Sequence, residues 1–266
     1  MKPLQAYLVG GSVRDGLLGL PGQDRDWVVV GSTEGDLLAR GFTAVGRDFP
    51  VFLHPETHEE YALARRWAGL SGGAWEHSPE ISLEEDLACR DLTVNALAER
   101  PDGSLVDPFG GRRDLEARVL RHVGDAFVAD PLRVLRVARF AAQLSPLGFT
   151  VAPETLELMA ELTGSGCLAS LVADRVWKEL HRSLALPVPH PFFGVLADCG
   201  ALDVVFPELV PSALGAEDRP LSALRAATVL GPSPLLRFAS LAQALPSSDG
   251  DLVAGFCRRV RAPRQY

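Results

Sequence analysis

The 266-residue sequence contains few cysteines, almost no lysine and no long apolar run. Its four cysteines (Cys89, Cys167, Cys199 and Cys257) never stand at CxxC spacing, which excludes a disulfide-stapled scaffold. No stretch of about 18 apolar residues is present, so we predict no membrane-spanning helix. The first residues also lack the apolar core of a signal peptide. A cytoplasmic, reduced protein is therefore expected.

A protein that binds nucleic acids in general is expected to carry a positive net charge, and this chain is acidic. The formal net charge is −8, and the first 110 residues contain 9 Lys and Arg against 18 Asp and Glu. The remainder of the chain is close to neutral. Hydrophobic residues make up 47% and charged residues 23%, which is typical of a globular protein and excludes a disordered one. The total charge thus disfavours general nucleic-acid binding.

Hydrophobic periodicity divides the chain into an α/β part and an all-helical part, with a boundary near residue 125. Short apolar or β-branched runs predict strands at 6–9, 27–30, 51–54, 61–64, 105–107 and 119–122. Helical spacing predicts helices at 12–18, 33–40, 83–97, 131–144, 153–162, 173–184, 189–199 and within 221–260. Residues 69–79 are rich in glycine and predict a loop.

Two carboxylates lead into the strongly β-branched strand at 27–30. Asp24 and Asp26 stand two residues apart, and in extended backbone such residues share a face. Adjacent like charges need a counter-cation, and Mg²⁺ fits because it takes oxygen ligands and leaves positions for phosphate. On its own the pattern also fits a solvated turn before a strand.

A Gly-Gly turn precedes these carboxylates, between a predicted strand and a predicted helix. Gly10 and Gly11 permit a close approach of the backbone to a triphosphate, and Arg14 adds a cation. A following helix start favours an anion. Glu60, expected on an adjacent strand, is the candidate third carboxylate. Three carboxylates and two metal ions describe a two-metal phosphoryl-transfer site.

Five motifs in this order resemble those of the bacterial class II tRNA nucleotidyltransferases, the CCA-adding enzymes, and their poly(A) polymerase relatives. The resemblance implies an α+β fold. It places a polymerase β-like nucleotidyltransferase head, with a mixed sheet and helices, at 1–125. An all-α neck and RNA-binding domain follows at 126–210, and 211–266 is a short helical remnant. The motifs are YLVGGSVRDGLLG (7–19), DRD (24–26), VGRDFPVFLH (45–54), CRDLTVNA (89–96) and DPLRVLRVARF (130–140).

The resemblance also implies roles for individual residues. The metal ligands are Asp24 and Asp26, and Glu60 completes the catalytic carboxylates. Asp91 lies near the ribose, and Asp130 with Arg133 reads the base. The implied nucleotide-binding residues are Gly11, Arg14, Arg90, Asp91, Asp130, Arg133, Arg136 and Arg139.

The spacing of the predicted residues between 130 and 139 agrees with a base-reading role. Asp130 and Arg133 stand three residues apart, so they share one face of a helix and offer acceptors and donors at fixed spacing. Such side chains can select cytosine and then adenine without a nucleic-acid template. Arg136 and Arg139 continue the same drifting stripe. A basic stripe alone also fits a solvated helix face.

The implied reaction is the addition of CMP and AMP to the 3′ end of tRNA. The tRNA 3′-hydroxyl attacks the α-phosphate of CTP or ATP, and pyrophosphate leaves. One Mg²⁺ is expected between Asp24, Asp26 and Glu60, and a second between both aspartates and the triphosphate. The sequence sets no oligomeric state. The alternatives are poly(A)-like or partial tailing of RNA, and a catalytically impaired RNA-binding remnant.

Three features depart from the family pattern. Cys89 and Ala129 stand where the family commonly has arginine and glutamate. We interpret Cys89 as a packed small residue rather than a nucleophile. No histidine follows His190, and Gln243-Ala244 stands where the His-Asp pair of an HD phosphohydrolase domain is expected. The sequence therefore predicts that this hydrolase activity is absent, in a chain shorter than usual for the family.

Overall fold

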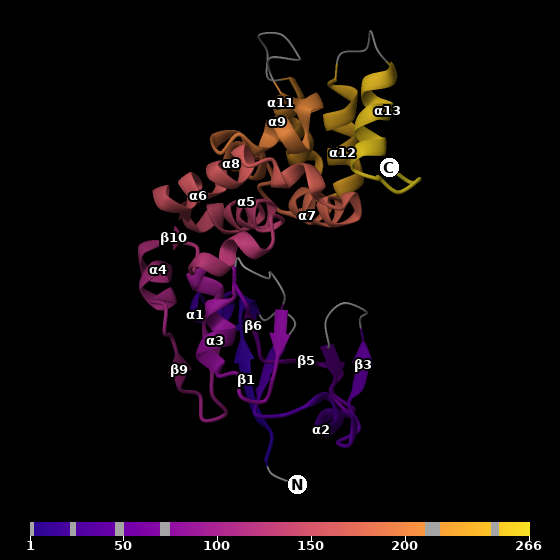
Figure 1. The fold of residues 1–266 in the computed structure, drawn as a ribbon. Coiled ribbons are helices and arrows are strands. Elements are labelled where there is room, and N and C mark those ends of the chain that lie inside the picture. Colours follow the sequence, from indigo (N-terminus) through magenta and orange to yellow (C-terminus); the bar gives the residue numbers. More distant parts are fainter. Residues whose placement is uncertain (1–2, 22–24, 46–50, 70–74, 211–218, 246–249) are drawn as a thin grey trace. The chain divides into compact units, whose positions relative to one another are not determined.

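The computed structural model describes residues 3–21, 25–45, 51–69, 75–210, 219–245 and 250–266. These residues belong to two compact units, Met1–Ala129 and Asp130–Tyr266. The first unit combines a mixed sheet with short helices, and the second is mainly helical, with a short strand, β11 (Thr150–Val151) (Figure 1). The predicted α+β class is confirmed. The proposed limits at residues 125 and 210 stay predictions.

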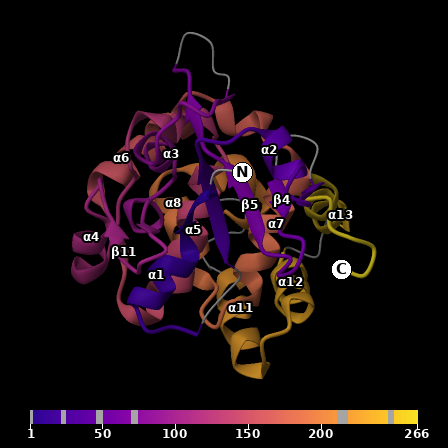
Figure 2. The same cartoon turned by 90° about the horizontal axis from the view of Figure 1, so that it is seen from below.

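A seven-stranded sheet forms the centre of the first unit, in the order β3-β4-β5-β2-β1-β8-β9. Strands β2 and β5 run parallel, and all other neighbours in this sheet are antiparallel. Figure 2 shows β4 and β5 side by side, as their pairing requires. The strands are β1 (Gln5–Val9), β2 (Asp26–Val30), β3 (Thr43–Val45), β4 (Val51–Leu53), β5 (Glu60–Leu63), β8 (Ala98–Glu99) and β9 (Leu105–Val106).

An apolar cluster covers each face of this sheet. Alternate residues of a strand point to opposite faces, so neighbouring residues belong to different clusters. Val28 and Ala64 belong to one buried cluster, which Leu87 of helix α3 (Leu83–Ala88) completes. Val29 belongs to the other cluster, together with Leu37 of helix α2 (Glu34–Leu38). The β2 residues with even numbers therefore face α3. Asp26 begins this even-numbered series.

The predicted helix at 83–97 is wrong beyond its first half. Helix α3 ends at Ala88, and a separate 3-10 turn, η1, spans Thr93–Asn95. The Asp91 side chain accepts a hydrogen bond from the Leu92 backbone (2.9 Å), and the Thr93 hydroxyl donates to Asp114 (2.8 Å). The Leu92 N–H thus donates to a side chain, and the Thr93 N–H donates to the Arg121 carbonyl (2.8 Å), so neither group continues the helix.

The predicted loop at 69–79 is also corrected in part. Residues Trp75–His77 form strand β7, which pairs antiparallel with β6 (Arg65–Trp67). Trp67 lies opposite Trp75, and the Arg65 guanidinium lies 4.4 Å from the Trp75 ring centroid. Aromatic and cation–π contacts across the strands favour a hairpin despite the glycines. Residues 70–74 lie outside the described residues.

The second unit is built from helices around a phenylalanine-rich core. Phe192, Phe193, Phe206, Phe238 and Phe256 are all fully buried. No helix in the described part of the chain is long and apolar enough to cross a membrane. The helices are α5 (Arg133–Leu144), α6 (Pro153–Gly164), α7 (Ala173–Ala185), α8 (His190–Asp198), α9 (Ala201–Val205), α11 (Arg219–Leu230), α12 (Pro234–Gln243) and α13 (Gly250–Arg259).

Candidate functional site

Two of the predicted catalytic carboxylates begin adjacent parallel strands. Asp26 of β2 is paired in register with Glu60 of β5. Residues in register on neighbouring strands point to the same face, at a strand spacing of about 4.8 Å. Both side chains are exposed. Asp24 lies outside the described residues, so its position stays a prediction.

The Gly-Gly turn lies beside this pair. Val9, the last residue of β1, is paired with Asp26 in register, so Gly10 and Gly11 follow directly. Gly10 has a φ of +73°, and an added Cβ there would lie 2.9 Å from Nη1 of Arg90. Only glycine combines this left-handed backbone with such a close approach. The turn leads into helix α1 (Gly11–Leu17).

Arg14 is buried in the first unit, at 1% exposure. Its Nε donates to Asp15 Oδ1 (2.8 Å), and its Nη1 donates to Asn95 Oδ1 (2.6 Å). The Asn95 amide nitrogen in turn donates to Asp91 Oδ1 (3.0 Å). Asp15 and Asp91 are 0% and 5% exposed. The structure therefore joins Arg14 and Asp91 through Asn95 in a buried polar layer.

Arg90 is held by the helix that precedes it. Its Nη2 lies 3.3 Å from Asp86 Oδ2, and its Nη1 donates to the Asn95 carbonyl at 3.5 Å. Asp86 is buried and also accepts a hydrogen bond from the Arg65 backbone (3.1 Å). When a buried carboxylate anchors a guanidinium, the other N–H groups of that guanidinium point in a fixed direction. Arg90 thus lies against the Gly10 turn.

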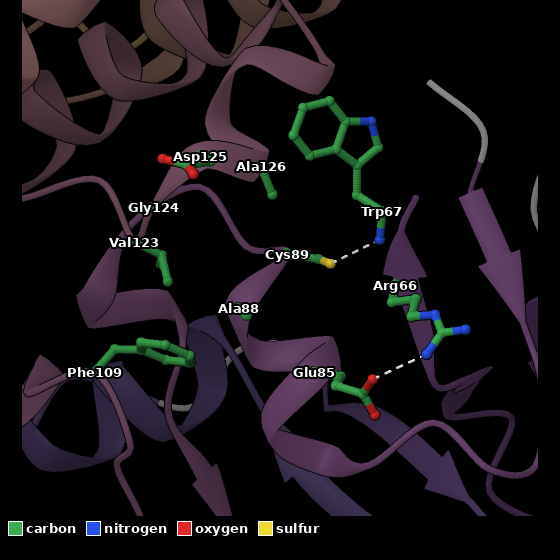
Figure 3. Close-up of a pocket in the computed structure, with 10 residues that line it drawn as sticks. All are labelled: Arg66, Trp67, Glu85, Ala88, Cys89, Phe109, Val123, Gly124, Asp125 and Ala126. Atoms are coloured by element: carbon green, nitrogen blue, oxygen red, sulfur yellow. Dashed lines mark hydrogen bonds and ion pairs between the residues drawn. The ribbon is translucent and has the colours of Figure 1, made fainter. Parts of the chain in front are cut away.

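A cavity of about 340 Å³ lies beside Ala88 and Cys89, the residues that precede Arg90 (Figure 3). Its lining includes Trp67, Phe109 and Cys89, and the ion pair of Arg66 with Glu85 (3.2 Å) lies at its edge. The Trp67 backbone donates to Cys89 Sγ at 3.2 Å. Cys89 is 4% exposed, as expected for a packed side chain.

A divalent metal ion is compatible with the carboxylate pair. Asp26 and Glu60 supply hard oxygen donors on one face, which is the donor type that Mg²⁺ prefers. Among the residues that the structure describes, no group of three or more His, Cys, Asp or Glu is arranged to hold a metal. The third predicted ligand, Asp24, is not among those residues. The identity of the ion therefore stays a prediction.

In the second unit, two side chains of α7 pair with two of the predicted nucleotide-binding residues, Asp130 and Arg139. Arg175 donates from Nη1 to Asp130 Oδ1 (3.2 Å) and from Nη2 to Oδ2 (2.6 Å). Glu179, one turn further along α7, accepts from Arg139 Nε (2.5 Å). Arg139 is 8% exposed, so this part of the stripe is not a solvated face.

The other two predicted residues of this unit, Arg133 and Arg136, lie in the first turns of α5. Arg133 is the first residue of the helix and is 5% exposed. Arg136 is half-buried, with its guanidinium 5.6 Å from the Phe140 ring centroid. The structure therefore presents two groups: Gly11, Arg14, Asp26, Glu60, Arg90 and Asp91 in the first unit, and Asp130, Arg133, Arg136 and Arg139 in the second.

Several residues of this site were missed by sequence reasoning. Asn95 contacts three predicted site residues, and Asp86 anchors Arg90. Asp86 and Arg90 stand four residues apart, a spacing typical of an ion pair on a helix, so the sequence could have predicted their contact. Arg175 and Glu179 share that spacing on α7. Their partners, however, depend on tertiary packing.

Comparison with known families and proteins identifies the relatives of this chain. Residues 6–121 match the Poly A polymerase head domain, and residues 148–212 match a probable RNA and SrmB-binding site of polymerase A. The Multifunctional CCA protein of Methylococcus capsulatus is 50% identical over 99% of this chain and 69% of its own length. The chain belongs to the CCA-adding enzyme family. The CCA-adding enzyme of Coxiella burnetii is likewise 50% identical, over 99% of this chain and 68% of its own.

Solved structures of the family share the fold. The Bacillus stearothermophilus CCA-adding enzyme in complex with CTP has a TM-score of 0.78 at 30% identity, over 98% of this chain and 62% of that one. The Thermotoga maritima CCA-adding enzyme complexed with tRNA has a TM-score of 0.73 at 26% identity, over 98% and 63%. The resemblance predicted from the five motifs is therefore confirmed for both family and fold.

Proposed function

We propose that this chain is a tRNA nucleotidyltransferase that adds CMP and AMP to the 3′ end of tRNA, using CTP and ATP. Family membership supports this enzyme class, and relatives of the chain have been solved with CTP and with tRNA. The observation on which the proposal depends is the register that sets Asp26 between Val9 and Glu60. This register places two carboxylates beside the Gly-Gly turn.

In the proposed reaction, the 3′-oxygen of tRNA forms a bond to the α-phosphorus, and the bond to the β-phosphate oxygen breaks. The hydroxyl loses its proton, and pyrophosphate leaves. Asp24, Asp26 and Glu60 are the residues that would hold Mg²⁺. When bound, the metal lowers the pKa of the attacking hydroxyl and neutralises charge on the leaving group.

The other residues bind and orient the nucleotide in this proposal. Gly11 brings the backbone close to the triphosphate, and Arg90 supplies a cation at the turn. The Arg14 side chain is buried against Asp15 and Asn95, so in this proposal it supports the nucleotide site from inside the protein. Asp91 orients the ribose. In the second unit, Asp130 and Arg133 read the base, with Arg136 and Arg139 in support.

One assay tests the function. The protein is incubated with Mg²⁺, labelled CTP and ATP, and a tRNA that ends at the discriminator base. Addition of CCA is the expected product. Addition of C, CC, a single A or a long A tail would instead assign a partial or poly(A)-like activity. Binding of tRNA without incorporation would show an RNA-binding remnant.

A further inference from the structure

The 3-10 turn η1 contains a side chain that contacts predicted nucleotide-binding residues from two separate motifs. Asn95 is 6% exposed, and its Oδ1 accepts a hydrogen bond from Arg14 (2.6 Å). Its Nδ2 donates to Asp91 (3.0 Å), and its backbone carbonyl accepts from Arg90 (3.5 Å). Arg14 lies 81 positions earlier in the chain. A single residue therefore links the turn motif to the Arg90-Asp91 motif.

The chemistry at this position requires an amide. The guanidinium of Arg14 can only donate, and Asp91 Oδ1 is the acceptor toward Asn95. An amide offers an acceptor and a donor on two different atoms, so it bridges them. A carboxylate at position 95 would meet Asp91 without a donor, and a serine hydroxyl is too short to replace both atoms.

The contacts on Asp91 fix the orientation of its carboxylate. Oδ1 accepts hydrogen bonds from the Leu92 backbone (2.9 Å) and from Asn95 (3.0 Å). Two donors on one oxygen restrict the orientation of the whole carboxylate. A carboxylate oxygen held in a fixed direction distinguishes a sugar by its hydroxyl donors.

We infer that Asn95 is a positioning residue for ribose selection, acting through Asp91. This inference rests on the proposed function, in which Asp91 contacts the ribose of the incoming nucleotide. Asn95 itself touches no substrate. Its role is to hold Asp91 in register with Arg14, so that CTP is preferred over dCTP.

A purely structural role for Asn95 would give a different result, and the same turn supplies a control. Thr93 is 2% exposed, and its hydroxyl donates to Asp114 (2.8 Å), which is not a partner of Asn95 in the bonds above. Thr93→Val removes this bond and weakens the turn, while the hydrogen bonds of Asn95 to Arg14, Asp91 and Arg90 involve no atom of the Thr93 side chain. It therefore reports on turn stability alone.

The experiment measures kcat and KM for CTP and for dCTP with a tRNA lacking CCA. For Asn95→Asp, the ratio of kcat/KM for CTP to that for dCTP is expected to fall about tenfold, since one lost buried hydrogen bond is typically worth that factor. Asn95→Ser, which adds no charge, should lower the ratio in the same direction and serves if Asn95→Asp does not fold. Thr93→Val should keep the wild-type ratio while its melting temperature falls.

An unchanged ratio in both Asn95 variants would overturn the inference, and so would an equal fall in Thr93→Val. A wild-type protein that adds CMP without preferring CTP over dCTP would also overturn it. A wild-type protein that adds no nucleotide at all would refute the proposed function instead. The two failures are therefore distinguishable.

Discussion

The exposed end of the head sheet and the buried layer beneath it use the same residue types for opposite purposes. Asp26 and Glu60 are exposed at the start of their strands, whereas Arg14, Asp15 and Asp91 are almost completely buried. An exposed carboxylate is solvated by water. A buried one needs fixed partners, because charge is costly to bury. The comparison sets exposed carboxylates against buried charged groups that have fixed partners in the protein.

The second unit repeats this division on a smaller scale. The side chains of Asp130 and Arg175 are 24% and 49% exposed. Those of Arg139 and Glu179 are only 10% and 4% exposed. One helix, α7, supplies both partners. The predictions below test whether exposure separates catalytic from structural effects in both units.

The largest effect is expected at the exposed carboxylates. Asp26→Asn should lower kcat/KM for CTP by about 100- to 1,000-fold, the usual cost of removing a group that stabilises transition-state charge. The melting temperature should change little, because the side chain is exposed. Steady-state incorporation assays and thermal unfolding provide the two readings.

Glu60 has a neighbour that serves as its control. Glu59 lies on the opposite face, where it accepts a hydrogen bond from the Trp27 indole (3.0 Å). Glu60→Gln should lower incorporation strongly, while Glu59→Gln should keep most of it. Equal activities in the two variants would contradict the assignment of Glu60.

A buried ion pair should affect stability far more than an exposed one. Glu179→Ala leaves the buried Arg139 guanidinium without its carboxylate and should lower the free energy of unfolding by about 3–5 kcal/mol. Arg112 and Glu116 form an exposed pair on α4 (Gly111–Ala117), both 68% exposed. Glu116→Ala should cost about 0.5 kcal/mol or less. Urea denaturation measures both, and similar losses would refute the distinction.

The Gly10 turn should show an intermediate effect. Gly10→Ala places a methyl group 2.9 Å from Arg90 at a φ of +73°, so it should cost about 1–2 kcal/mol and raise KM for CTP. Gly16 in α1 provides the control, since no described atom lies within 4 Å of an added methyl there. Gly16→Ala should be stabilising by about 0.5–1 kcal/mol. A larger loss at Gly16 than at Gly10 would contradict the assignment.

The smallest effect is expected from pH. Burial, followed by the charge of Arg121, lowers the pKa of His122 in the first unit below its ordinary value of 6.5. The unfolded chain therefore binds more protons below about pH 6.5, so stability is complete above that value and falls as the pH is lowered through it.

His122→Asn should flatten the loss of stability between about pH 7.5 and about pH 5.5, the range in which histidine titrates. The measurement is urea denaturation at both pH values. His190 in the second unit, whose pKa is lowered mainly by burial, offers the parallel variant. An unchanged slope in His122→Asn would show that this histidine does not contribute.

The sequence predicted most of the fold in places where local signals are strong. The β-branched run of β2 and the apolar spacing of α5 gave correct elements. The helix predicted across 83–97 is wrong beyond Ala88, because the Leu92 N–H donates to the Asp91 side chain and the Thr93 N–H donates to the Arg121 carbonyl. Hydrophobic periodicity does not reveal such bonds. The strand Trp75–His77 was hidden by neighbouring glycines.

The resemblance of five motifs, in their order along the chain, was enough to identify the family from the sequence. Asp26 before a β-branched strand and Gly10-Gly11 before a helix are both local patterns. Tertiary structure alone decided that Glu60 lies beside Asp26, that Arg14 is buried rather than exposed, and that Asn95 joins Arg14 to Asp91. These facts depend on strand pairing and on contacts across as many as 81 positions, where local propensity has no influence.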